Sequence, residues 1–238
     1  MDVATQGDSS VGSDGASDSG QDSAEVGSPF CTSLATKPLL CEDFDSLELP
    51  GAFFESQVNA GGSLVLDKSA FVSGSRSLAA SVSAGASDAA ECHLVRNYAS
   101  APTVYSLGFS VRIDKVTQGS GVDMARLVLG SGNASHHLIL GFGNRLTVGE
   151  QFGPGLETFI GHSTSQTMKV GDWARIEVTL NAVAHTLVIT LNGVVTVQDT
   201  IDSSWVPASQ RLQVGISYSG NSGAGWGMHI DDVVYDAK

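Results

Sequence analysis

The residues best suited to recognise a ligand lie in a Gly/Asn-rich segment, YSGNSGAGWG, which begins at Tyr218, contains Asn221 and nearly ends at Trp226. Sugar rings present apolar C–H faces that stack on aromatic side chains, and hydroxyls that bond to amides and charged groups. This segment is therefore predicted to bind a carbohydrate, and Asn144 and Arg145 of the GFGNR segment are predicted as further contacts. The alternative is that the aromatic rings are buried anchors of the core, as Trp and Phe often are.

A second set of residues has the chemistry for cleavage. β-Elimination from a uronic acid needs a Tyr or His base beside an Arg or Gln that neutralises the carboxylate. His136, His137, Arg145, Gln151 and Tyr218 have these side chains but are scattered along the sequence. Adjacent residues of a strand point to opposite faces, so at most one of the two histidines can enter a groove. The alternative is that the pair lies on a surface strand, with one His packed in the core and the other polar. No catalytic residue is assigned.

The three cysteines are Cys31, Cys41 and Cys92. Cys31 and Cys41 bracket a short loop, and a disulfide between them would fasten the first strand to the preceding segment, leaving Cys92 as a buried thiol. A bridge between Cys41 and Cys92 and a fully reduced chain are the open alternatives. No Cys/His spacing in the sequence is typical of a zinc site.

The elements that must position these residues are β-strands. Apolar side chains alternate with polar ones, as at 105–113, 176–180 and 187–191, and long amphipathic helices are absent. The Asn192-Gly193 pair predicts a two-residue hairpin turn. Strands are predicted at 40–45, 63–66, 76–83, 91–96, 104–114, 124–130, 136–141, 145–150, 157–160, 173–180, 186–198 as a hairpin, 211–217 and 227–235. Many short strands separated by Gly-rich turns indicate an all-β, two-sheet antiparallel jelly roll.

The chain of 238 residues has a formal net charge of -13 and only 12 Lys and Arg, which argues against a nucleic-acid partner. Residues 1–28 are predicted to be a disordered acidic Ser/Gly linker, since they lack aromatic side chains, Leu and Ile. Residues 29–238 then form the jelly-roll domain, with 29–38 tied to the first strand. No transmembrane segment is evident. The linker is typical of an exported extracellular or cell-surface protein, such as a lipoprotein, whose signal or lipid anchor is not in this sequence.

Several segments, taken in order, carry a family resemblance. They are CEDFDS, FVSGSRSLAASV, YSLGFSVRID, GDWARIEVTLNAVAHTLVITLNGVV and LQVGISYSGNSGAGWGMHIDDVVYDA. This order resembles the concanavalin A-like lectin/glucanase superfamily, and in particular the laminin-G-like jelly-roll domains of secreted bacterial proteins. The most specific motifs are W-x-R-I-E-V, which starts at Trp173, then LNG and IDDVV. The resemblance implies a jelly-roll sandwich of two curved sheets, in a superfamily whose members bind or cleave polysaccharides.

The resemblance also implies that the first and last strands are neighbours and that a structural calcium ion lies near them on the convex side. The matching positions are Asp43 or Asp45 and Asp231, with Asp232 and Glu42 as alternates. Calcium takes about six to eight oxygen ligands, which carboxylates, backbone carbonyls and water can supply. The alternative is that these acids are solvated and protect strand edges from pairing.

Hydrolases of the resembled superfamily carry two Glu with an Asp between them at alternate positions of one strand. This sequence has no E-x-D-x-E or E-x-D-x-x-E motif, which argues against hydrolysis. The preferred function is a non-catalytic, lectin-like carbohydrate-binding module of a secreted or surface-tethered protein. A structural or protein-interaction domain of the cell envelope is the first alternative, and a polysaccharide lyase or hydrolase the second. The small number of basic residues favours a neutral glycan over an acidic one.

Overall fold

The computed structural model describes residues 30–45, 48–59, 61–86, 90–100, 102–131, 134–164, 166–202, 207–220 and 223–238. The predicted linker at 1–28 lies outside the described residues, as does Asn221 of the predicted binding segment. Within the described part of the chain, no helix is long and apolar enough to cross a membrane.

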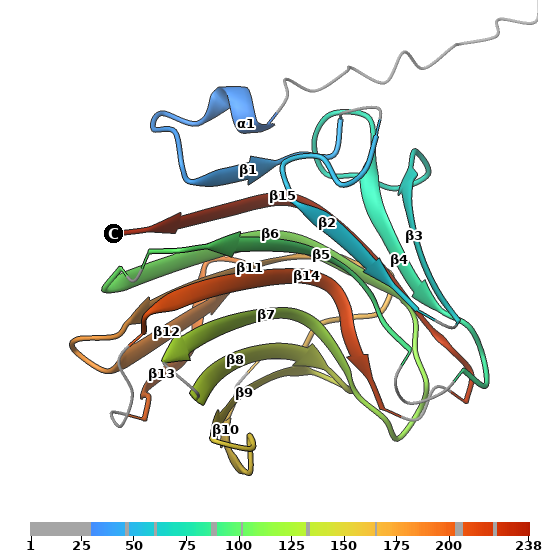
Figure 1. The fold of residues 1–238 in the computed structure, drawn as a ribbon. Coiled ribbons are helices and arrows are strands. Elements are labelled where there is room, and N and C mark those ends of the chain that lie inside the picture. The colour runs from blue at the N-terminus through green and yellow to red at the C-terminus, as the bar shows by residue number, and fades with distance from the viewer. Residues whose placement is uncertain are drawn as a thin grey trace, which may run out of the picture.

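The chain forms two antiparallel β-sheets with curved strands, packed as a sandwich (Figure 1). The elements are α1 (Phe30–Ser33), β1 (Leu40–Glu42), β2 (Glu55–Val58), β3 (Gly62–Asp67), β4 (Ser77–Val82), β5 (Cys92–Tyr98), β6 (Val104–Lys115), β7 (Val122–Ser131), β8 (Ala134–Phe142), β9 (Leu146–Gly153), β10 (Thr158–His162), β11 (Trp173–Asn181), β12 (Thr186–Leu191), β13 (Val194–Thr200), β14 (Ser209–Ser219) and β15 (Trp226–Ala237). Sheet A has the order β13-β12-β11-β6-β15-β4-β3, with β1 also paired to β15, and sheet B has the order β10-β9-β8-β7-β14-β5-β2.

The core lies between the two sheets and is built from the alternate side chains that the sequence pattern indicates. On β6, Leu107, Phe109, Val111 and Ile113 are all buried, while the residues between them face outward. Leu212, Val214 and Ile216 do the same on β14 of sheet B. Burying one face of each strand removes apolar surface from water and thereby fixes which side chains remain on the outer faces.

Local turn chemistry also follows the prediction. Asn192 and Gly193 have φ values of 51° and 76°, and β12 and β13 pair directly across them. Asn and Gly adopt positive φ more easily than other residues, and that conformation matches the twist of a tight hairpin. The strand β2 was not predicted, because its sequence ESQV has no apolar alternation and most of its residues are exposed.

The first and last strands are neighbours, as the resemblance implies: Leu40 pairs with Tyr235 and Glu42 with Val233. A disulfide between Cys31 and Cys41 fastens α1 to β1. Cys92 is a buried free thiol. The predicted cysteine pairing is therefore confirmed.

A chain of polar contacts, buried except at Asp199, links one edge of sheet B to the adjacent edge of sheet A. Glu150 of β9 accepts hydrogen bonds from Nε2 of His136 at 2.7 Å and from Nε2 of His162 at 2.8 Å. Nδ1 of His162 lies 2.9 Å from Oδ2 of Asp199 on β13. Both ring nitrogens of His162 therefore face carboxylates, which favours the imidazolium form.

The contacts within this cluster shift the pKa values of His162 and Glu150. The bond to Glu150 raises the pKa of His162, against the effect of burial and with the help of Asp199. Burial raises the pKa of Glu150, but the bonds from His136 and His162 outweigh it and lower this pKa to about 2. Both shifts mean that the charged pair stabilises the folded state.

We expect His162→Gln to lower the free energy of unfolding most in weakly acidic solution. The raised pKa of His162 gives a contribution that is complete below the unfolded value of 6.5 and declines as pH rises; the lowered pKa of Glu150 gives one that is complete above 4.5 and declines toward pH 2. The loss should be about 1.5–3 kcal/mol, the scale of hydrogen bonds to charged groups. Urea denaturation of both proteins at pH 5.5 and pH 8.5 measures it.

His137→Gln is the matched control for this experiment. Burial lowers the pKa of His137 to about 4, so this side chain costs stability below pH 6.5 and none above. The difference between His137→Gln and the wild type should therefore shift in the opposite direction as pH falls. If His162→Gln lowers the free energy of unfolding equally at both pH values, the charged pair of His162 and Glu150 does not stabilise the fold as proposed.

Candidate functional site

The outer face of sheet B collects long polar side chains from strands far apart in the sequence. The register places His93 beside Gln57 of β2 and Gly215 of β14, and Gln213 beside Arg126 of β7. These residues alternate with core residues on their own strands, so their side chains share the outer face.

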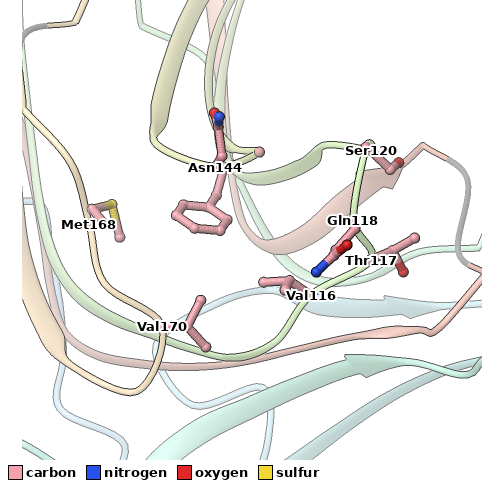
Figure 2. A pocket seen from close by; sticks show the side chains of 10 residues that line it. Val116, Thr117, Gln118, Ser120, Asn144, Met168 and Val170 are labelled. Carbon is pink, nitrogen blue, oxygen red and sulfur yellow. The ribbon is translucent and has the colours of Figure 1, made fainter.

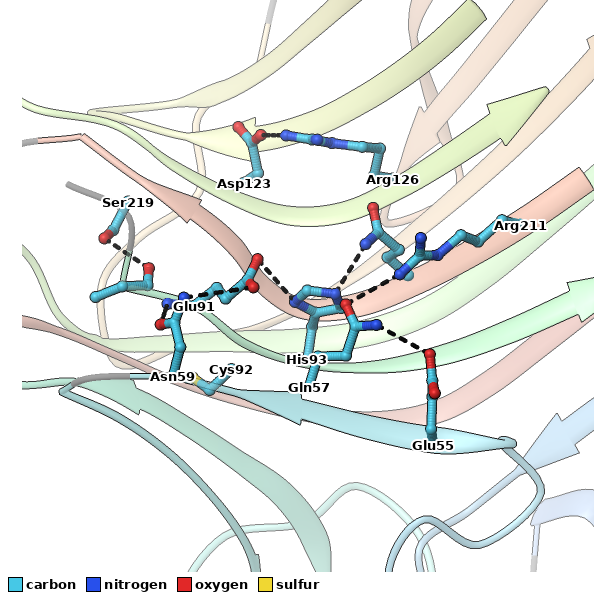
Figure 3. A network of polar contacts seen from close by, with 12 residues as sticks. Glu55, Gln57, Asn59, Glu91, Cys92, His93, Asp123, Arg126, Arg211 and Ser219 are labelled. Carbon is cyan, nitrogen blue, oxygen red and sulfur yellow. Dashed lines mark hydrogen bonds and ion pairs between the residues drawn. The ribbon is translucent and has the colours of Figure 1, made fainter. Parts of the chain in front are cut away.

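His93 is at the centre of a polar network on this face (Figure 3). Its Nε2 lies 2.8 Å from Nε2 of Gln213, and its Nδ1 lies 3.8 Å from Oε2 of Glu91. Arg211 donates to Oε1 of Gln57 at 2.9 Å. Within the described residues, Arg211 has no carboxylate at ion-pair distance. The network therefore holds a guanidinium whose charge no carboxylate among the described residues balances.

The electrostatics keep the His93 ring neutral. Burial, reinforced by the charges of Arg211 and Arg126, lowers the pKa of His93 to about 4. Since the Gln213 amide nitrogen is a donor, Nε2 of the neutral ring acts as the acceptor. Gly215, with a φ of 119°, lets β14 approach β5 here; a Cβ at this position would lie 2.8 Å from Cα of His93.

A pocket of about 530 Å³ opens on the same face beside this network. It is lined by Asp123, Arg126, Ile139, Thr147, Val148, Gly149, Gln151, Phe159 and Tyr218. Two of these are exposed aromatic rings, Tyr218 at 49% and Phe159 at 65%. Arg126 donates to Oδ2 of Asp123 at 2.6 Å, and burial raises the pKa of Asp123 against the effect of Arg126. The pocket thus combines aromatic walls with charged and amide groups.

The residues predicted to bind a ligand lie in different parts of the structure. Tyr218 is exposed in the pocket described above. Trp226 is only 1% exposed, because it begins β15 with its ring in the core, so the expected exposed ring at this position is wrong. Asn144 and Arg145 lie in the exposed β8–β9 turn, and neither lines the pocket of Tyr218. Asn144 lines a separate pocket at the end of the sandwich.

The two adjacent histidines point to opposite faces, as their spacing predicts. His136 is in the buried cluster between the sheets. His137 lies on the outer face of sheet B, with its Nε2 3.1 Å from Oγ of Ser135. Burial, followed by the charge of Arg126, lowers the pKa of His137 to about 4.

Sequence reasoning missed most of the outer-face residues, namely Gln57, His93, Arg126, Phe159, Arg211 and Gln213. A partial signal was present in QRLQVGI, where Arg211 and Gln213 alternate with buried Leu and Val. Such long polar side chains at alternate positions of a central strand mark the outer face. Which of them meet is decided by strand pairing over long sequence separations.

The predicted metal ligands lie near one another at the junction of β1 and β15. Asp231 accepts backbone N–H groups of Val72 at 2.7 Å, Ser73 at 3.2 Å and Asp232 at 2.8 Å. Burial raises the pKa of Asp231 to about 7, and the Asp232 carboxylate adds to the effect. Within the described part of the chain, no group of three or more His, Cys, Asp or Glu has an arrangement that could hold a metal ion.

The neighbouring acids also serve as anchors of loops. Oδ1 of Asp45 accepts the N–H of Ser75 at 2.6 Å, and Oδ2 of Asp43 accepts the N–H of Cys31 at 3.2 Å. Burial raises the pKa of Asp232, and the charges of Asp43 and Asp45 contribute. The acids therefore converge and repel one another, and calcium at this place stays a prediction.

No protein-family model and no curated protein matches this chain. Solved structures do match its fold. The endo-β-1,4-glucuronan lyase of the fungus Trichoderma reesei has a TM-score of 0.68 at 12% identity, over 85% of this chain and 96% of the lyase. Cellulose induced protein Cip1 has a TM-score of 0.60 at 16% identity, over 84% and 97% of the two chains.

A third match is domain 4 of AbnA, a GH43 extracellular arabinanase from Geobacillus stearothermophilus, in complex with arabinotriose. Its TM-score is 0.57 at 15% identity, over 83% of this chain and 91% of that domain. Similarity at such identities establishes the fold alone. Together with the sheet topology, it confirms the predicted two-sheet antiparallel jelly roll.

We expect added calcium to raise the melting temperature if the acids bind it. Binding to the folded state alone stabilises by about 2.7 kcal/mol when free calcium is 100 times the Kd. Calorimetry of the protein in EGTA and in graded calcium measures the shift. Asp231→Asn should abolish it, while Asp236→Asn, on the same strand and paired with Lys238, should not. If calcium leaves the melting temperature unchanged, these acids serve only to anchor loops.

Proposed function

We propose that the outer face of sheet B binds a carbohydrate chain, with the pocket between Tyr218 and Phe159 as its central sugar site. The observation that carries this proposal is that two exposed aromatic rings line one pocket together with charged and amide side chains. Aromatic faces stack on the C–H faces of sugars, and the polar groups bond to hydroxyls. The pocket's volume lies within the usual range for ligand sites of about 300–1,000 Å³.

The polar surface continues beyond this pocket, which favours a chain over a single sugar. Arg126 lines the pocket and is opposite Gln213 on β14. Gln213 and its partner His93 on β5 are buried, so they support this surface and do not form it. Arg211 and Gln57 extend the surface to β2, at the edge of sheet B. A ligand that follows this line crosses five strands or more and needs several linked sugar units.

The comparisons support a carbohydrate ligand to the extent that the matched proteins include a glucuronan lyase and an arabinanase domain that holds arabinotriose. The Cys31–Cys41 disulfide supports the expectation of a secreted or surface-tethered protein, because such bonds persist in oxidising compartments. The laminin-G-like relationship and the lipid anchor remain expectations from the sequence.

Tyr218→Ala and Phe159→Ala should each weaken glycan binding by about 1–3 kcal/mol, since truncating a central aromatic anchor removes stacking area. A glycan array identifies the ligand, and isothermal calorimetry with that ligand measures the loss. Phe54→Ala is the matched control, because Phe54 is 61% exposed and lies outside the pocket, over Arg96. If Phe54→Ala weakens binding as much as Phe159→Ala, or no glycan binds, this site is wrong.

A second candidate function is eliminative cleavage of an acidic polysaccharide. It is favoured by the placement of Arg126 and Arg211 on neighbouring strands of the outer face, next to a neutral His93 and the exposed Tyr218. The small number of basic residues favoured neutral glycans at the level of composition, but two of the 12 Lys and Arg lie on this face. Guanidinium groups are the preferred partners of carboxylates.

In such a reaction, a base removes the proton next to the uronate carboxyl while a guanidinium neutralises that carboxylate. The bond from the neighbouring ring carbon to the glycosidic oxygen breaks, the leaving oxygen takes a proton, and the new chain end carries a C=C bond. Tyr218 is the exposed group in the pocket that can exchange a proton with the ligand, and Arg126 lies in the same pocket. No water is consumed.

We expect Tyr218→Phe to slow the formation of unsaturated product by about 100-fold or more. Glycan binding should be retained, since a phenyl ring stacks but cannot transfer a proton. Ultraviolet absorbance of the C=C bond, with polyglucuronate and alginate as substrates, measures the reaction. Arg211→Gln should raise KM, and Arg112→Gln, on β6 of sheet A, should have no effect. Binding without any unsaturated product in the wild type would exclude the lyase and keep the binding module.

A further inference from the structure

A second pocket, of about 580 Å³, opens at one end of the sandwich (Figure 2). The β6–β7 loop, the start of the β8–β9 turn and the β10–β11 connection surround it. The side chains of Val116, Met168 and Val170 face one another around this space. Phe142, at the end of β8, also lines it. The pocket therefore lies where the ends of both sheets meet, and it shares no lining residue with the pocket of Tyr218.

The pocket reaches from solvent to the hydrophobic core. Phe142 is 2% exposed and Met168 is 6% exposed, and both belong to the core between the sheets. Val170, in contrast, is 49% exposed. An apolar side chain exposed at the mouth and core side chains at the base form a continuous apolar wall, which is the usual lining of a small-molecule site.

The polar groups around this wall are all uncharged. Gln118, Ser120 and Asn144 line the pocket, and the Gln118 and Asn144 side chains are exposed. The Thr117 hydroxyl is engaged with the carbonyl of Gly225 at 3.0 Å. None of the described lining residues is ionisable, although the protein carries a net charge of -13. The ligand that matches this lining is neutral, because an ion would lose its hydration without gaining a partner.

We propose that this pocket is a second ligand site, which takes an uncharged aromatic ring bearing a hydroxyl. The ring lies among Val116, Phe142, Met168 and Val170, where the thioether makes favourable contacts with aromatic groups. The hydroxyl points to the amide of Gln118, which lies beside Val116. A free sugar fits less well, since its hydroxyls would lie unpaired against the apolar wall.

The four methionines offer a direct test through their methyl NMR signals after ¹³C-methyl labelling. Met168 lines the pocket, whereas Met124 and Met228 are 0% and 1% exposed in the core and serve as internal references. Titration with 4-methylphenol should shift the Met168 signal saturably and leave the two references in place. Benzoate and methyl glucoside should not shift it, since one is charged and the other lacks an aromatic ring.

Two valine variants locate the site. Val170→Asp puts a carboxylate at the mouth and should weaken 4-methylphenol binding by at least about tenfold. Val183→Asp is the matched control, because Val183 is 70% exposed in the remote β11–β12 turn. The proposal is overturned if the Met168 signal does not saturate, or if the Met124 and Met228 signals shift as much as that of Met168. It is also overturned if methyl glucoside shifts the Met168 signal as 4-methylphenol does, or if the two variants bind 4-methylphenol with the same affinity.

Discussion

Burial of one face of every long strand between the two sheets is the constraint on which the rest of this structure depends. Side chains such as Phe109 and Ile216 are fully buried in that space. The intervening side chains therefore lie on the outer faces, since successive residues of a strand point to opposite sides. The polar groups of β5, β7 and β14 are thereby brought onto one surface, and the candidate glycan site follows from the same burial that stabilises the fold.

The sandwich also gives one residue type opposite electrostatic roles. His93 is buried beside guanidinium groups and stays neutral, whereas His162 is buried between two carboxylates, which raise its pKa. Burial alone disfavours the charged ring in both places, and the neighbouring groups decide the outcome. The neutral His93 ring can accept a hydrogen bond from Gln213, while His162 between the sheets is fixed by its contacts with Glu150 and Asp199.

The two pockets differ because their walls have different origins. The pocket of Tyr218 is lined by outward side chains of β7, β8, β9, β10 and β14, where polar residues face solvent, and so combines charged groups with exposed aromatic rings. The pocket of Met168 is formed where loops at the end of the sandwich leave the core partly uncovered, and its wall is apolar. The two pockets of this small domain therefore differ in charge density and polarity.

The sequence by itself determined what local pattern and covalent chemistry control. Alternation of apolar residues indicated nearly all of the strands and the opposite orientations of His136 and His137, and the Asn192-Gly193 turn indicated its hairpin. The spacing of Cys31 and Cys41 favoured the bond that joins them. Each of these features depends on residues within one strand, turn or loop.

Tertiary structure alone decided which of those residues meet. The strand β2 has no hydrophobic pattern and exists because it pairs with β5. Trp226 is buried because its side chain lies on the core face of β15, as those of Met228 and Ile230 do. Gln213 reaches His93 across 120 residues of sequence. Such contacts depend on strand register, which is set by the joint packing of two sheets and not by any local pattern.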